Sequence, residues 1–165
     1  MKPKNYLPEF VYGGIDGTIT TFAIVSGVVG ASLNSSIILI LGFANLFADG
    51  FSMAVSNYLS EKSKEDLLSR KRTVGKSLAK KRAAVTFFSF LIIGFIPLLS
   101  FVFGFENKYV FSVVLTAFAL ITVGWFKGLI TGKKKFYSSL QTLIIGGIAA
   151  FIAFFIGYFI KTLLS

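Results

Sequence analysis

The sequence of 165 residues contains no cysteine and no histidine. These absences exclude disulfide bonds, thiolate zinc sites, imidazole ligands and histidine-based acid–base catalysis. A metal would have to be held by oxygen ligands and methionine sulfur, which suit Mg, Ca, Mn or Fe(II) better than Zn or Cu(II). The sequence also lacks a nucleophile–base pair and a redox cofactor motif, so we expect neither an enzyme nor a permanently bound cofactor.

Acidic residues are scarce, with seven Asp and Glu against 17 Lys and Arg, and the net charge is +10. A basic surplus can indicate nucleic-acid binding, but here the basic residues are confined to segments between long apolar runs. The chain is 55% hydrophobic without counting glycine, whereas soluble domains reach about 45–50% with glycine included. We therefore predict an all-α integral membrane protein that contacts lipid and not nucleic acid.

The apolar runs predict five transmembrane helices in one domain covering residues 1–165, because each run is close to the roughly 20 residues that a bilayer requires. Pro8 lies where the first helical turn before span 1 could begin, and Pro97 predicts a kink in span 3. The charge spacing after Glu61 predicts that the second helix continues beyond its span, and Gly75 predicts a break in this extension. The expected spans are about 10–31, 37–60, 83–103, 109–126 and 136–164, with a basic cytosolic linker at 61–82.

Basic residues are distributed very unequally between the two sides of these spans. Fifteen Lys and Arg lie on the side of the N-terminus and two, Lys108 and Lys161, on the other. The positive-inside rule then places the N-terminus in the cytosol and the C-terminus outside. The first run has no cleavage pattern of a signal peptide, and a chain without a leader suggests a prokaryotic plasma membrane.

The second span carries a carboxylate, Asp49, near its middle, where a charge costs several kcal/mol. Span 1 carries Asp16, and a tight turn at 33–36 makes the two spans antiparallel neighbours. Both carboxylates can therefore face one another in the inner half of the membrane. Helical spacing groups further polar residues with them: Asn45, Met53 and Ser56 share the face of Asp49, with Ser52 and Asn57 nearby, and Thr20 shares the face of Asp16.

This arrangement suits a partly dehydrated divalent cation, and the methionine sulfur favours a transition metal such as Fe(II). Each of these residues could instead have a structural role. Asp16 could bond the backbone near the membrane edge, Asp49 could bond Asn45 or a threonine, and Met53 could serve packing alone. Three further acidic residues form either a solvated, salt-bridged face or a cytosolic access site for metal: Glu61, Glu65 and Asp66.

Two segments, YGGIDGTITTFAIVSGVVGASL in span 1 and FANLFADGFSMAVSNYLSEKS in span 2, resemble the vacuolar iron transporter family, as does IIGFIPLLS in span 3. The resemblance implies a homodimer with the ion path between the copies of spans 1 and 2. It also implies export of cytosolic Fe(II), often with Mn(II), in exchange for protons. Asp16 and Met53 match the family's Asp and Met. Asn45 stands where well-known members have Glu, and the carboxylate is displaced one turn to Asp49.

Those members also carry a Glu-rich cytosolic metal-binding domain between spans 2 and 3, which is missing here. We therefore expect a short transporter that exports Fe(II), Mn(II) or both by proton antiport. The alternative is a non-transporting membrane scaffold or assembly subunit whose Asp residues serve helix packing. Gly13 and Gly17, four residues apart, predict a close helix–helix approach in either case.

Overall fold

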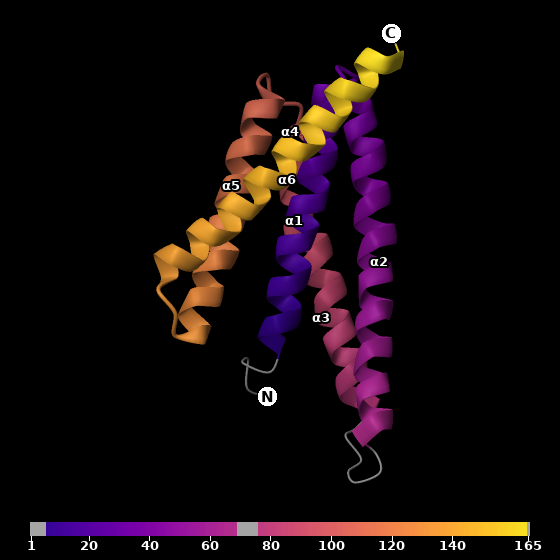
Figure 1. Cartoon of the computed structure of the whole chain (residues 1–165), viewed down its shortest axis with the longest axis vertical. Coiled ribbons are helices and arrows are strands. Elements are labelled where there is room, and N and C mark those ends of the chain that lie inside the picture. The colour runs from indigo at the N-terminus through magenta and orange to yellow at the C-terminus, as the bar shows by residue number, and fades with distance from the viewer. Residues whose placement is uncertain (1–5, 69–75, 165) are drawn as a thin grey trace.

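The structure, a computed structural model, describes residues 6–68 and 76–164, and regular structure in these ranges is entirely helical. Figure 1 shows long helices running along one axis, with α6 crossing α1 and α5 obliquely. The elements are α1 (Leu7–Gly30), α2 (Ser35–Leu68), α3 (Lys76–Gly94), the 3₁₀ turn η2 (Ile96–Leu98), α4 (Leu99–Val102), α5 (Lys108–Thr131) and α6 (Lys135–Leu164).

The prediction of five spans is confirmed, since five helical stretches in the described residues are long and apolar enough to cross a membrane. Their ends differ from the predicted ends by a few residues, mostly because helices continue into the polar flanks. The stretches are Leu7–Gly30, Ser35–Lys64, Leu78–Val102, Lys108–Thr131 and Lys135–Leu164.

The segment expected as a basic linker is largely helical where it is described. As predicted, α2 continues beyond its span and ends only at Leu68. Helix α3 begins at Lys76, so its first two turns are drawn from the same basic segment. A break predicted at Gly75 lies outside the described residues.

Local sequence signals set the breaks between the first spans and within the third. Asn34 precedes α2, and its side-chain Oδ1 accepts a hydrogen bond from the Ser36 backbone N–H at 2.9 Å, which is the role of a helix N-cap. The kink predicted at Pro97 is confirmed, because α3 ends at Gly94 and Pro97 lies in η2. Proline cannot supply a backbone N–H to the helix. Its carbonyl accepts a hydrogen bond from Ser112 Oγ at 2.8 Å, which ties the kink to α5.

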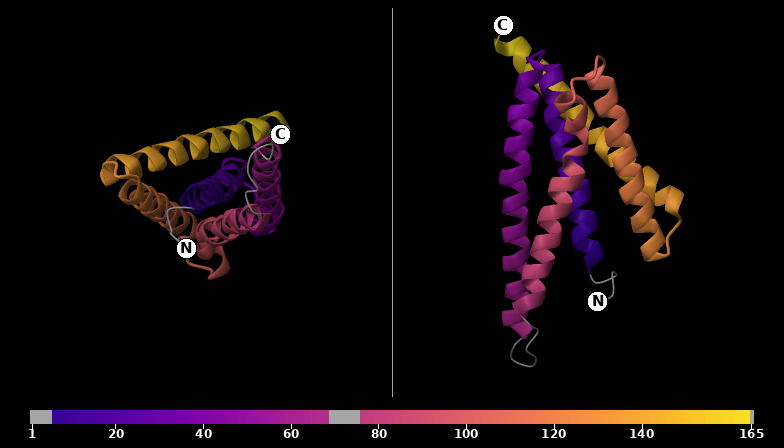
Figure 2. Two further views of the ribbon diagram at one scale, coloured as in Figure 1. Left: turned by 90° about the horizontal axis from the view of Figure 1, so that it is seen from below. Right: turned by 180° about the vertical axis from the view of Figure 1, so that it is seen from behind.

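Helix α1 lies in the middle of the bundle, with α2, α3, α5 and α6 around it, as the end-on view in Figure 2 shows. Glycines allow α3 and α6 to approach it closely. A Cβ atom on Gly17 would lie 2.5 Å from the carbonyl oxygen of Phe90 in α3. Gly30 meets α6 in the same way at the other end, since a Cβ atom there would clash with the carbonyl oxygen of Phe154. The predicted close approach at Gly13 and Gly17 is therefore made to α3 of the same chain.

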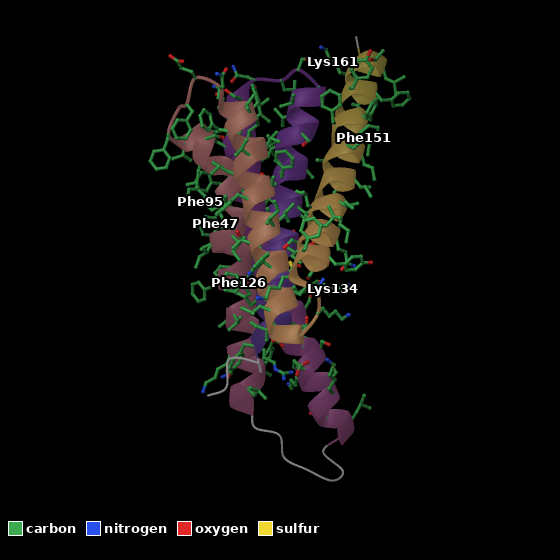
Figure 3. The ribbon with its side chains drawn as sticks, turned by 90° about the vertical axis from the view of Figure 1, so that its left-hand side faces the viewer. Phe47, Phe95, Phe126, Lys134, Phe151 and Lys161 are labelled. Carbon is green, nitrogen blue, oxygen red and sulfur yellow. The ribbon has the colours of Figure 1, made fainter. Side chains whose placement is uncertain are left out.

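The outer surface of the bundle is strongly apolar. In Figure 3, aromatic side chains including Phe47 and Phe151 stand out from the helices between the levels of Lys134 and Lys161. Phe47 is 57% exposed and Phe151 63% exposed. Exposed aromatic rings over this length of helix are compatible with lipid and not with water, which supports a membrane-embedded bundle.

Candidate functional site

The two intramembrane carboxylates lie on neighbouring helices and influence one another. Asp16 is partly buried on α1, Asp49 is partly buried on α2, and the two negative charges repel each other. In the part of the chain that the structure describes, neither carboxylate makes a hydrogen bond or ion pair. The backbone bond considered for Asp16 and the Asn45 bond considered for Asp49 are therefore not formed. Two unpaired, mutually repelling carboxylates are a configuration that a cation or protons would stabilise.

A hydrogen bond joins α1 and α2 one turn from these carboxylates. Asn45 Nδ2 donates to Thr20 Oγ1 at 3.2 Å, and Thr20 Oγ1 donates to the backbone carbonyl of Asp16 at 2.9 Å. The Asn45 amide thus links the two helices. Thr20 in turn connects this link to the backbone of Asp16.

Met53 lies one turn beyond Asp49 and is 8% exposed. It belongs to the hydrophobic core, which also contains Leu46 and Phe90, so packing accounts for part of its role. It also lines a cavity of about 280 Å³ at the N-terminal end of the bundle, together with Tyr12, Ser56, Asn57, Ser60, Glu61 and Lys64. Its thioether is therefore at the boundary between the core and a polar space.

A second cavity of about 350 Å³ shares Tyr12, Asn57, Glu61 and Lys64 with the first and adds Pro8, Glu9 and Arg82. We call the two together the vestibule. It lies one helical turn from both intramembrane carboxylates, since Tyr12 precedes Asp16 by four residues and Met53 follows Asp49 by four. Ser52 and Ser56 are four residues apart, so they lie on one side of α2, and both are exposed.

An ion cluster at the vestibule joins three helices. Arg82 of α3 pairs with Glu61 of α2 through Nη1 and Oε2, and its Nε lies 3.4 Å from Oε1 of Glu9 in α1. Lys64 also pairs with Glu61, at 2.8 Å. The salt-bridged interpretation of the acidic segment therefore describes Glu61.

The other two acidic residues of this segment, Glu65 and Asp66, do not line the vestibule as far as it is described. Asp66 is exposed, and the side chain of Glu65 lies outside the described residues. Among the side chains that are described, no three Asp or Glu groups come together in a way that could hold a metal within one chain. A metal site built from a single chain would therefore need amide, hydroxyl or thioether ligands as well.

Sequence reasoning did not assign several vestibule residues to the site, and the most important of these are Glu9, Tyr12 and Arg82. Glu9 was available as a signal, because it is an acidic residue at the start of a predicted span. Its partner Arg82 was hidden among nine Lys and Arg between residues 61 and 82, where topology alone accounts for the positive charge.

A further groove lies elsewhere in the described part of the chain and has a different character. It measures about 530 Å³, runs between α2 and α3, and is lined chiefly by apolar residues such as Phe51, Val55 and Phe87. No carboxylate lines it. It therefore offers no cation site and matches a surface covered by lipid.

Comparison with known proteins identifies the family of this chain. The sequence profile of the VIT family matches residues 7–80 and 74–158. The chain is similar to the vacuolar iron transporter of Plasmodium berghei (strain Anka), at 26% identity over 228 aligned positions that cover 96% of this chain and 84% of that protein. It is similar to the vacuolar iron transporter of Centaurea cyanus, at 29% identity with 88% and 84% covered.

Vacuolar iron transporter homolog 3 of Arabidopsis thaliana is 30% identical over 157 positions, covering 88% of this chain and 78% of that protein. The 228 positions aligned with the Plasmodium protein exceed the 165 residues of this chain, so that relative has residues which this chain lacks. These relatives are eukaryotic and named for the vacuole, so they give no support to the prokaryotic plasma membrane expected from the sequence. By profile and by relatives alike, the chain belongs to the VIT family.

Proposed function

We propose that the chain exports Fe(II), Mn(II) or both from the cytosol in exchange for protons. The observation that carries this proposal is the pair of unpartnered carboxylates, Asp16 and Asp49, on facing helices next to a polar vestibule. The names of the relatives agree with an iron substrate. Carboxylates next to a thioether favour a divalent transition metal over Mg²⁺ or Ca²⁺, because the soft sulfur has little affinity for those hard ions.

Proton coupling follows from the chemistry of a buried carboxylate. Such a group binds a proton or a metal but not both well, so one residue can exchange the two. Asp49 is our choice for this exchange, with Asp16 shaping the access from the vestibule. When metal leaves, the repulsion between neighbouring carboxylates favours uptake of a proton.

The proposed orientation puts the vestibule at the cytosolic face. It is supported by the 15 basic residues on the side of the N-terminus against two on the other side. Because the natural chain has no cysteine, a cysteine in place of Ser60 can be labelled selectively. An impermeant thiol reagent should reach it from the cytosolic side, and labelling only from the opposite side would reverse the orientation.

We also propose that the transporter is a homodimer with the ion path at the two-fold axis. Ser52 and Ser56 support this, because both are exposed on the membrane-spanning part of α2 next to the carboxylates. Polar groups are unfavourable against lipid. A second copy would cover them and bring four carboxylates to the shared axis.

Replacing Asp49 by Asn tests the exchange mechanism. In proteoliposomes loaded with a pH-sensitive dye, Asp49→Asn should abolish Mn²⁺-driven proton flux while the protein remains folded, because the amide cannot release a proton. The matched control is Glu106→Gln, which neutralises an exposed carboxylate in the turn between α4 and α5. That variant should transport like the wild type.

Unchanged flux in Asp49→Asn would overturn the proposed mechanism. The scaffold alternative makes a separate prediction, since its Asp residues serve helix contacts. If Asp16→Ala and Asp49→Ala bind Mn²⁺ as the wild type does but lose self-association, the scaffold is the better description. Loss of a saturable Mn²⁺ site between α1 and α2 in either variant, with any binding in the vestibule retained, supports the transporter.

A further inference from the structure

Glu9 is a buried carboxylate with an unsatisfied oxygen. The residue is 6% exposed, and its Oε2 has no hydrogen-bond partner in the part of the chain that the structure describes. Leaving a buried carboxylate oxygen unpaired is costly. Glu9 lines the vestibule, so the missing partner can come from that space.

A second oxygen in the vestibule is also unsatisfied. Asn57 Nδ2 donates to Thr86 Oγ1 at 3.1 Å, which fixes the orientation of the amide, and Asn57 Oδ1 is buried without a partner. Glu9, Asn57 and Glu61 thus line one polar space with carboxylate and amide oxygen atoms. Such oxygen ligands suit Mn²⁺ and comparable divalent cations.

Lys64 and Arg82 supply the positive charge in this space, and of the two, Arg82 contacts both carboxylates. Its guanidinium reaches Glu61 of α2 and Glu9 of α1 from α3, but the contact to Glu9 is a loose 3.4 Å, and the Arg82 Nε is buried without a hydrogen bond. Together with Lys64 it balances the charges of Glu9 and Glu61. A metal cation can therefore bind these carboxylates only if a basic side chain moves away from them.

We propose that Arg82 is a tethered counter-cation that competes with divalent metal for Glu9 and Glu61, so that the vestibule is a metal site whose occupancy Arg82 limits. This inference rests on the proposed function for its metal and its direction of access. The Arg82 side chain is 27% exposed. It can withdraw toward the membrane surface with its apolar stem still packed, as long basic side chains do.

The test measures metal in the vestibule without requiring transport. Ser60 lines the vestibule, so Mn²⁺ bound there should slow maleimide labelling of a Ser60→Cys variant. Adding Arg82→Gln should lower the Mn²⁺ concentration for half-protection by roughly tenfold, the factor expected if Arg82 holds the carboxylates about nine-tenths of the time. Adding Glu9→Gln to that variant should weaken protection again.

Lys81→Gln is the matched control, because it removes the same charge from the neighbouring, exposed position on α3. A similar shift of the half-protection concentration in Lys81→Gln would show a general surface-charge effect and overturn the proposal. Unchanged or weaker protection in Arg82→Gln would also overturn it. If Arg82→Gln does not fold because Glu9 is left unpaired, the same labelling measurement on Arg82→Lys tests the proposal. A lysine is a point charge that cannot span both carboxylates, so an unchanged half-protection concentration there would also overturn the proposal.

The two proposals fail in different ways. In Asp49→Asn, transport should be lost while Mn²⁺ still protects Ser60→Cys and Arg82→Gln still strengthens that protection. Normal transport in Asp49→Asn contradicts the exchange mechanism alone. Absence of any Mn²⁺ protection in Arg82→Gln contradicts the vestibule site alone.

Discussion

Met53 is in contact with two environments, which gives it two separable roles. It packs in the same core as Leu46 and Phe90, and it lines the vestibule beside the carboxylates. Packing depends on volume, whereas metal preference depends on the sulfur atom. A substitution that keeps the volume and removes the sulfur can therefore separate the two roles.

We predict that Met53→Leu changes selectivity more than stability. A volume-conserving swap of this kind usually costs less than about 1.5 kcal/mol, so thermal unfolding in detergent should shift little. Loss of the soft ligand should reduce discrimination against Mg²⁺ in a competition transport assay. Leu46→Met is the control, because it alters a buried core residue that does not line the vestibule. Unchanged selectivity in Met53→Leu would assign the residue to packing alone.

At the residue scale, the sequence was informative wherever the relevant contacts follow helical spacing or a short turn. Asp16, Thr20, Asn45 and Asp49 could be grouped because spans 1 and 2 are joined by a tight turn and must be neighbours. Arg82 could not be assigned to the site, because its contacts depend on how α3 packs against α1 and α2. No local pattern distinguishes it from the other basic residues near it.

The packing of α1 against α3 depends on small residues on both helices. Gly17 faces Phe90, and Gly94 faces Gly17 in turn, with a Cβ on Gly94 lying 2.8 Å from the Gly17 carbonyl. Because both neighbours are backbone atoms, they cannot rotate away as a side chain can.

Gly17→Ala should therefore destabilise the protein by about 1–3 kcal/mol, the usual cost of overpacking, because its Cβ would lie 2.5 Å from the Phe90 carbonyl oxygen. The measurement is denaturant or thermal unfolding in detergent micelles. Gly147→Ala on α6 is the control, since a Cβ there meets no atom within 4 Å. Equal stability of the two variants would mean that α1 and α3 can separate without cost.

At the element scale, the number of spans, the kink at Pro97 and the extension of α2 were all predictable, because each depends on local composition or a local breaker. The central position of α1 was not. Its glycines indicate close packing on more than one side, but the sequence does not say which helices provide it. In the structure both α3 and α6 do, at opposite ends of α1.

For the whole molecule, the polar face of α2 is the feature that a single chain leaves unexplained. Ser52 and Ser56 are exposed and make no hydrogen bond within the described residues. Both lie in the stretch Ser35–Lys64 that can cross the membrane. Hydroxyl groups without partners are disfavoured in hydrocarbon, so a second copy, water in an ion path, or both should cover them.

A cysteine in place of Ser56 tests the dimer proposed from this face. If the two-fold axis runs along it, Ser56→Cys in the membrane should form an intermolecular disulfide on mild oxidation, because symmetry brings the two copies of one residue together at the axis. The chain has no other cysteine, so any covalent dimer on a non-reducing gel must come from this site. Mn²⁺ in the path should slow the reaction.

The control is Phe51→Cys, which lies on another face of α2 in the apolar groove with α3. If α2 meets its copy through the serine face, Phe51→Cys stays monomeric on the gel while Ser56→Cys cross-links. The reverse result would place the interface at the groove and move the two pairs of carboxylates away from a common axis. Metal would then pass through each subunit separately, between α1 and α2, and the two Asp residues of one chain would have to perform the exchange without the partner's pair.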